Sequence, residues 1–132
     1  MTTLTVSSEA CESWTVLRAV GEIDLVSGGR IRAEAHRLVA EGQRRIVIDL
    51  GGVRFCDSSG IGVLIGARRL LRSCGGELRL VLPPAPPGAE AGQAGHVHRV
   101  FTALGLRRLF DIHPDVASAT AAPVPRPLAR PA

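Results

Sequence analysis

Two adjacent serines interrupt an otherwise apolar stretch, and they are the residues with the clearest capacity for chemistry. Ser58 and Ser59 follow Asp57 in the segment "RFCDSSGIGVLIGARRLL", residues 54–71. A serine at the point where a strand gives way to a helix can serve only to start that helix. Its hydroxyl can also accept a phosphate. The pattern alone leaves both interpretations open.

The first interpretation depends on Asp57, which is well placed to be the N-cap of a helix. Its carboxylate can accept the backbone N–H of Ser59 or Gly60, and both serines would then lie in the first turn. The second interpretation depends on electrostatics and space. A helix start presents unpaired N–H groups and the positive end of the helix dipole, so a phosphate on Ser58 is tolerated there. Gly60 and Gly62 would let the backbone of a partner approach.

The helix that follows is more hydrophobic than a helix lying on one sheet needs to be. It carries two apolar lines, one formed by Ile61, Leu64 and Ile65 and the other by Val63, Ala67 and Leu70. The surplus can form an exposed docking patch near Ser58. It can equally belong to a deeply buried helix.

Three familiar enzyme templates do not fit this segment. A phosphate-binding P-loop needs a lysine, and the chain contains none. A nucleophile elbow needs a glycine two residues before the serine, where Ser58 has Cys56 and Ser59 has Asp57. Asp49 could act as the acceptor of a response-regulator receiver, but the acidic pair and the late lysine of that template are missing. We therefore expect a protein without catalysis of its own.

The composition indicates one soluble domain. The chain has 132 residues, of which 45% are hydrophobic and 21% charged. Its first residues lack the basic start and apolar stretch of a signal peptide, so we expect a cytoplasmic protein. The net charge is +4, and all 16 basic residues are arginine. Nucleic-acid binding is nevertheless disfavoured because aromatic side chains, on which bases stack, make up only 3% of the chain.

The chain offers no convincing metal or cofactor site. Cys11, Cys56 and Cys74 form no C-x-x-C pair, which argues against a zinc site or a disulfide framework. His96 and His98 could lie on one side of a strand, but no third ligand follows at a suitable spacing. We expect no cofactor and no bound metal.

Hydrophobic periodicity and turn residues predict alternating strands and helices. Strands are expected at residues 2–7, 14–20, 44–50, 77–82 and 108–112, and helices at 27–41, 58–73, 96–105 and 115–122. A turn at 21–24 leaves the second strand, and a Pro/Gly/Ala loop occupies 83–95. This order predicts an α/β domain with a mixed, largely parallel sheet that begins with two N-terminal strands and packs against helices.

Four segments together resemble a known family. They are "GEID" at 21–24, "IVIDLGGVRFCDSSGIGVLIGA" at 46–67, "GGELRLV" at 75–81 and "LGLRRLFDI" at 104–112. The chain resembles bacterial anti-sigma-factor antagonists, which are small STAS-domain proteins. The resemblance runs over residues 4–119 and is most specific at residues 57–62. We expect a single STAS-type domain over residues 1–119 and a disordered tail rich in Pro, Ala and Arg over residues 120–132.

The resemblance implies a function switched by phosphorylation. In the family, the serine after the motif aspartate is phosphorylated by the partner, an anti-sigma factor that is itself a serine kinase. By match this serine is Ser58, and Ser59 is a second candidate acceptor. The unphosphorylated protein would bind the anti-sigma factor and free a sigma factor. Phosphorylation would release it, and a PP2C-type phosphatase would restore it.

The resemblance also implies a partner-binding surface around Ser58. We expect it to comprise Asp24, Asp57, Ser59, Gly60, Ile61, Gly62 and Leu64. The "SGG" at residues 27–29 departs from the family pattern and leaves the cap of the first helix open. Two alternatives remain: a STAS scaffold or regulatory subunit of another assembly, such as a stressosome-like or lipid-transport complex, and a domain that binds a small ligand or nucleotide.

Overall fold

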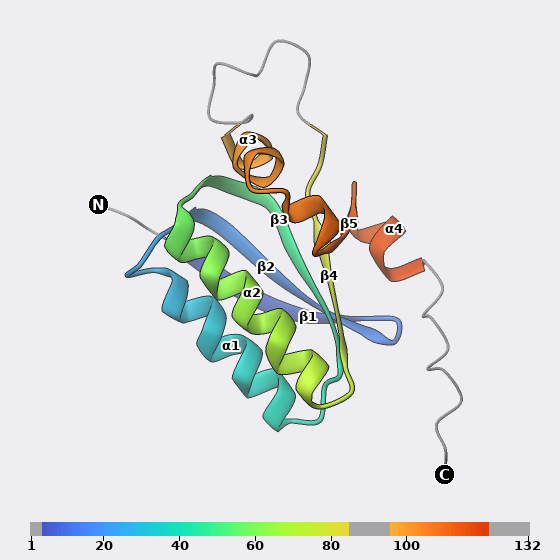
Figure 1. Ribbon diagram of the computed structural model, residues 1–132. Coiled ribbons are helices and arrows are strands. Elements are labelled where there is room, and N and C mark those ends of the chain that lie inside the picture. Colours follow the sequence, from blue (N-terminus) through green and yellow to red (C-terminus); the bar gives the residue numbers. More distant parts are fainter. Residues whose placement is uncertain (1–3, 85–95, 122–132) are drawn as a thin grey trace.

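The elements of the protein were obtained from a computed structural model, which describes residues 4–84 and 96–121. They are, in chain order, β1 (Leu4–Cys11), β2 (Trp14–Ile23), α1 (Gly28–Ala40), β3 (Arg45–Cys56), α2 (Ser58–Ser73), β4 (Glu77–Val81), α3 (His96–Ala103), the 3-10 turn η3 (Leu106–Arg108), β5 (Asp111–His113) and α4 (Val116–Ala121). Figure 1 shows α1 and α2 side by side across one face of the sheet, with α3 at one end and α4 beside β4 and β5.

The sheet follows the chain order β1-β2-β3-β4-β5. β1 pairs with β2 in antiparallel fashion, and the remaining neighbours are parallel. The predicted fold class, a mixed sheet begun by two N-terminal strands, is therefore confirmed. Because parallel strands share a direction, the residues that follow β2 and β3 emerge at the same edge of the sheet.

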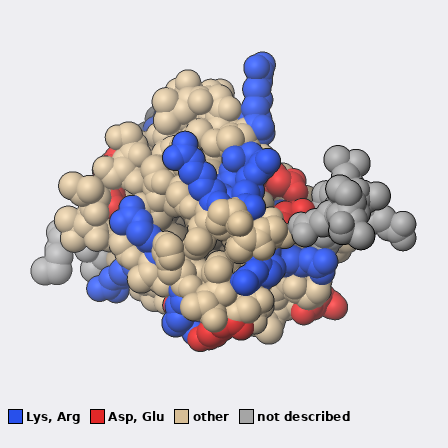
Figure 2. All heavy atoms as spheres, turned by 60° about the horizontal axis from the view of Figure 1, so that its bottom comes forward, with Lys and Arg blue, Asp and Glu red and all other residues tan. Residues whose placement is uncertain are grey.

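Charged side chains are distributed unevenly over the surface. Figure 2 looks at the end where α1 and α2 finish, and arginine side chains outnumber acidic ones on that face.

Arg37 on α1 is paired, with its guanidinium 2.6 Å from Glu34 and 2.5 Å from Glu41. Glu34 also accepts a hydrogen bond of 2.8 Å from the Ser8 hydroxyl, which ties α1 to β1. Hydrogen bonding from Arg37 lowers the pKa of Glu34 to about 2.

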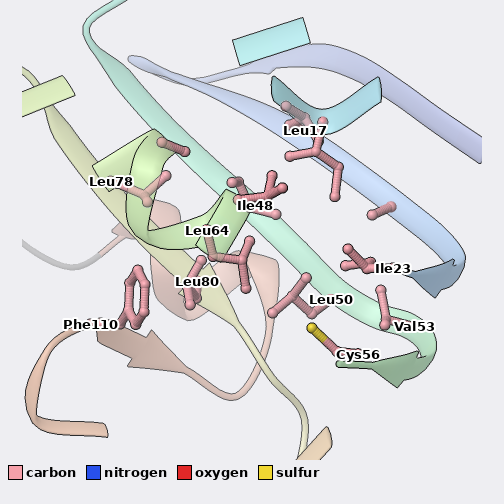
Figure 3. Packing of buried hydrophobic residues seen from close by; sticks show 14 of the residues in the cluster. Leu17, Ile23, Ile48, Leu50, Val53, Cys56, Leu64, Leu78, Leu80 and Phe110 are labelled. Carbon is pink, nitrogen blue, oxygen red and sulfur yellow. The ribbon is translucent and has the colours of Figure 1, made fainter. Parts of the chain in front are cut away.

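The main hydrophobic core lies between the sheet and the pair α1 and α2, where Figure 3 shows α2 side chains meeting those of β2, β3 and β4. Leu64 of α2 is fully buried against this sheet. Val63 on the second apolar line packs towards α1, since a Cβ added to Gly28 would lie 2.8 Å from its Cγ2. The hydrophobic surplus of α2 is thus explained by two packing partners, the sheet and α1.

A smaller cluster covers the opposite face of the sheet, and α4 closes it. It contains Trp14, Val16, Val47, Val81 and Ala119. Arg79 is only 1% exposed, stacks 4.3 Å from the Trp14 ring centre and donates a 2.6 Å hydrogen bond to the Ala119 carbonyl. It also pairs with Glu77 and Asp111, each at 3.2 Å. One buried cation therefore fixes α4 to the sheet.

Three strands run further than the sequence predicts, and the first of them, β1, continues to Cys11 where the predicted strand ends at residue 7. β2 continues to Ile23 and β3 to Cys56, so the predicted turn at 21–24 lies mostly within a strand. The pairing passes two register shifts, between Arg18 and Val20 and between Gly21 and Glu22. The prediction placed a turn at Gly21, whereas that glycine lies inside β2 beside one of these irregularities.

The C-terminal part also differs in detail. The predicted strand at 108–112 is a 3-10 turn followed by the short strand β5, because Leu106 and Phe110 both turn inwards to the main core. α4 ends at Ala121, so residues 120 and 121 of the predicted tail are helical. The rest of that tail and most of the predicted loop at 83–95 lie outside the described residues. Within residues 4–84 and 96–121, no helix has the length and apolarity needed to span a membrane.

Candidate functional site

The candidate site forms where β2 and β3 end. Ile23 and Cys56 are paired in the last register position of the two strands. The backbone N–H of Asp57 then donates a 3.3 Å hydrogen bond to the Ile23 carbonyl. The turn that leads from β2 into α1 and the first turn of α2 are therefore side by side. This arrangement brings Asp24 and Asp57 to one edge of the sheet, as the sequence motifs predict.

Asp57 caps α2 as predicted. It has extended backbone angles, and its Oδ1 accepts the backbone N–H of Gly60 at 2.9 Å. The helix then begins at Ser58, whose side chain is exposed, while Ser59 is half-buried. Among the described residues, none forms a hydrogen bond with the Ser58 hydroxyl. The fold therefore uses the carboxylate of Asp57 and leaves the neighbouring hydroxyl available.

The two glycines of this turn have different roles. A Cβ on Gly60 would lie 2.7 Å from Ile23 Cγ2, 2.8 Å from Cys56 Sγ and 2.9 Å from the Ile23 carbonyl oxygen. Gly60 is therefore required for close packing of α2 on β2 and β3, and it presents no surface to a partner. Gly62 is exposed, and nothing lies within 4 Å of an added Cβ. Because Gly62 has no side chain, it leaves room on the outer face of α2 for the backbone of a partner, as the sequence predicts.

Three of the expected partner contacts are not at the surface, namely Gly60, Ile61 and Leu64. Ile61 is 4% exposed and Leu64 is fully buried, so the interpretation of these apolar residues as an exposed docking patch is wrong. α2 lies beside α1 on one face of the sheet, and the sheet and α1 together take up both of its apolar lines. These buried side chains anchor the N-terminal part of α2 on the core and so fix the position of Ser58.

Asp24 organises the turn before α1. Its Oδ1 accepts the backbone N–H of Val26 at 3.0 Å and that of Ser27 at 2.8 Å. The Ser27 hydroxyl donates to the Glu22 carbonyl at 2.7 Å and accepts the Asp24 N–H at 3.0 Å. The Asp24 carboxylate therefore closes the turn that leads into α1, whereas Ser27, at the cap position, makes no side-chain cap hydrogen bond to the helix. This settles how α1 begins without the family's usual residues.

Sequence reasoning missed an exposed apolar pair in that same turn. Leu25 is 80% exposed and Val26 is 86% exposed, the highest values among the large hydrophobic residues described. Phe55, which precedes the site on β3, is 38% exposed and stacks on His96 with ring centres 4.9 Å apart. Apolar residues in a short polar turn between a strand and a helix were the available signal.

The thiol of Cys56, two residues before Ser58, is unreactive. Burial, assisted by the nearby charge of Asp57, raises the pKa of Cys56 to about 12, so the thiol stays protonated and is a poor nucleophile. Among the described residues, no group of three metal-ligating side chains comes together. The chemistry that this arrangement supports is acceptance of a phosphate by an exposed hydroxyl at a helix N-terminus.

Comparisons with known proteins agree with this geometry. The family model of the STAS domain matches residues 5–119. The chain is 30% identical to an anti-sigma F factor antagonist of Paenibacillus polymyxa over 105 residues, which are 79% of this chain and 81% of the relative. It is 35% identical to an anti-sigma F factor antagonist of Lysinibacillus sphaericus over 72 residues, which are 54% of this chain and 61% of the relative.

Solved structures show the same fold. A crystal structure of an anti-sigma factor antagonist from Mycobacterium paratuberculosis superposes with a TM-score of 0.72 at 24% identity, covering 89% of this chain and 92% of the other. The phosphorylated form of the Bacillus cell fate determinant SpoIIAA gives a TM-score of 0.61 at 24% identity, covering 88% of this chain and 96% of the other.

Proposed function

The chain belongs to the STAS domain family, and we propose that it is an anti-sigma factor antagonist switched by phosphorylation of Ser58. In its unphosphorylated form it binds an anti-sigma factor that is also a serine kinase, and a sigma factor is thereby freed. Phosphorylation of Ser58 by that partner ends the interaction. A PP2C-type phosphatase returns the protein to its binding form.

The observation that carries this proposal is the accessibility of the Ser58 hydroxyl. It is exposed on the first residue of a sixteen-residue helix, and no described residue forms a hydrogen bond with it. Ser59, the other candidate acceptor, is half-buried. A kinase can therefore reach Ser58 without unfolding the helix. The names of the relatives, which are anti-sigma factor antagonists, support the assignment of the partner's class.

The partner surface is proposed to centre on Ser58 and to differ from the one expected from sequence. Asp24, Asp57, Ser59 and Gly62 stay in it through exposed or half-buried positions, whereas the buried residues only support it. We add the turn residues Leu25 and Val26, because large exposed apolar side chains beside a polar site are typical anchors of a protein interface.

A phosphate at Ser58 should change the stability of the fold little and reduce the affinity for the partner strongly. It adds about −1.5 to −2 charges at the positive end of a helix dipole, where a negative charge is tolerated. In a closed interface the same charge must be desolvated beside apolar Leu25 and Val26, and it repels any acidic group of the partner that lies against Ser58. One like-charge contact near 4 Å is worth about 4 kcal/mol at a surface-like dielectric. Since about 1.4 kcal/mol changes an affinity tenfold, a loss of at least about 100-fold is expected.

The proposal is tested by affinity purification from the native cell lysate with four baits: wild type, Ser58→Ala, Ser58→Glu and Ser59→Ala. We expect an ATPase-like serine kinase to be retained by wild type, Ser58→Ala and Ser59→Ala and to be lost with Ser58→Glu. Incubation of the purified pair with ATP should phosphorylate wild type and Ser59→Ala but not Ser58→Ala, as read by intact mass.

The controls separate loss of binding from loss of folding. All four baits should unfold at closely similar temperatures, because none of these side chains is packed in the core. Retention of the kinase by a folded Ser58→Glu bait would contradict the switch. Co-purification of every bait with a membrane transporter or with a large STAS assembly would instead favour a scaffold or regulatory subunit.

A further inference from the structure

A second candidate interaction surface lies on the C-terminal half of α2, away from Ser58. Arg68, Arg69 and Arg72 occupy the last two turns of this helix. Figure 2 looks at the end of the molecule where α2 finishes, and arginine side chains outnumber acidic ones on that face. At 1.5 Å of rise per residue, Arg68 begins about 15 Å along the helix from Ser58.

Two of these arginines form one wall of a hollow of about 400 Å³. Arg68 and Arg72 are four residues apart, so their side chains lie on the same side of α2. Leu78 and Leu109 also line the hollow, as do the carboxylates of Glu77 and Asp111. The hollow thus combines two guanidinium groups, an apolar part and two acids.

The two acids of the hollow are already engaged elsewhere. The buried guanidinium of Arg79 pairs with Glu77 and with Asp111, each at 3.2 Å. No carboxylate among the described residues lies within ion-pair distance of Arg68 or Arg72. The outer face of α1 differs, because Arg37 there is paired with two glutamates on its own helix. Arg68 and Arg72 therefore keep their full hydrogen-bonding capacity for a ligand.

We propose that this hollow binds an acidic segment of a partner protein, with Arg68 and Arg72 holding its carboxylates. A guanidinium forms two parallel hydrogen bonds with a carboxylate, and two such groups one helical turn apart fit two acidic side chains of one segment. The apolar part formed by Leu78 and Leu109 can take a small aliphatic side chain between them. This proposal goes beyond the phosphorylation switch and does not rest on it.

The composition of the hollow favours a protein segment over other polyanions. A continuous phosphate backbone would pass Glu77 and Asp111, and the single positive charge of Arg79 neutralises at most one of these two carboxylates. Among the described residues, the most exposed large apolar side chains, Leu25 and Val26, belong to the turn after β2, whereas Leu78 and Leu109 of the hollow are buried or half-buried and do not project into a lipid surface. A segment with separated carboxylates can place each one on an arginine and avoid the acids.

The test measures binding of a short fluorescein-labelled peptide of glutamate and serine with one central leucine, by fluorescence anisotropy at low salt. The double variant R68Q/R72Q should bind at least about tenfold more weakly than wild type, because it loses two charge-assisted contacts. The matched control is R32Q/R99Q, which removes the same charge from exposed arginines outside the hollow and should bind as wild type does. A peptide with glutamine in place of glutamate should not bind.

Three results would overturn the proposal. The first is no measurable binding by wild type, and the second is an equal loss in both double variants, which would indicate attraction by net charge alone. The third is tighter, Arg68- and Arg72-dependent binding to duplex DNA or to phosphatidylserine vesicles than to the peptide. Ser58→Glu should bind the peptide as wild type does, so failure at this surface and failure of the phosphorylation switch are distinguishable.

Discussion

The protein contains two strand-to-helix junctions that are built alike and used differently. Each of the strands β2 and β3 is followed directly by an aspartate whose side chain accepts backbone N–H groups, Asp24 in the turn before α1 and Asp57 in the first turn of α2. At the first junction the serine three residues later, Ser27, is 6% exposed and its hydroxyl is held by three hydrogen bonds. At the second junction Ser58 follows the aspartate directly and is exposed.

The difference shows how a fold separates a structural serine from a regulatory one. Ser27 satisfies backbone groups of the turn before α1, so modifying it would break that turn. Ser58 contributes nothing to the cap of α2, because Asp57 alone accepts the Gly60 N–H. The second junction can therefore change its charge without changing its shape.

The largest expected effect comes from the packing beneath the second junction. Gly60→Ala places a methyl group 2.7 Å from Ile23 Cγ2 and 2.9 Å from the Ile23 carbonyl oxygen, which belongs to the backbone and cannot move away cheaply. We expect a loss of about 2–3 kcal/mol in the free energy of unfolding, measured by urea titration. The matched control is Gly66→Ala on the same helix, where nothing lies within 4 Å of the new methyl group.

Gly66→Ala should be more stable than wild type by about 0.5–1 kcal/mol, because alanine is the better helix former. If both variants lost the same stability, the close contact of Gly60 with β2 would not be what fixes the junction.

The next effect contrasts the two serines directly. Ser27→Ala leaves the Glu22 carbonyl and the Asp24 N–H without their hydroxyl partner, so we expect a loss of about 1–2 kcal/mol in the free energy of unfolding. Ser58→Ala should change it by less than about 0.5 kcal/mol, since its hydroxyl has no partner among the described residues. Chemical denaturation of both variants measures the difference. Equal losses would mean that Ser58 is also a structural residue.

The smallest expected effect is a change of stability at acidic pH, and it distinguishes α1 from α2. The pKa of Glu34 in the folded protein is about 2, below its ordinary value of 4.5, because Arg37 donates hydrogen bonds to it. A lowered pKa means that the stabilisation is complete above about pH 4.5 and is lost as the pH falls towards 2. α2 contains no carboxylate, so it makes no comparable pH-dependent contribution to stability.

Glu34→Gln should therefore be slightly less stable at neutral pH, by less than about 1 kcal/mol, since the pair is near the surface. Its stability should fall less steeply than that of wild type between pH 4.5 and 2, the interval set by the two pKa values of Glu34. Thermal unfolding at several pH values measures both slopes, and parallel slopes would show that the pairing of Glu34 with Arg37 does not stabilise the fold.

Local features of the molecule were readable from the sequence. The alternation of strands and helices, the start of α2 at Ser58 and the cap by Asp57 all follow from residues within one turn of each other, because capping involves groups only three positions apart. Ser58 was identified as the candidate acceptor through the family resemblance, which is most specific at residues 57–62. A few motif residues were enough for the family, which the comparisons then confirmed.

Burial and proximity were decided by the tertiary structure alone. The two apolar lines of α2 fit a docking patch or a buried helix equally well until α1 is seen packed against Val63. Gly60 suggested an open turn, and only the position of Ile23 on another strand shows that it is a packing requirement. The hollow beside Arg68 and Arg72 likewise needs β4, Leu109 and the start of β5 to complete it. A sequence specifies which surfaces a helix has, whereas the partner that covers each surface comes from distant segments and exists only in the assembled fold.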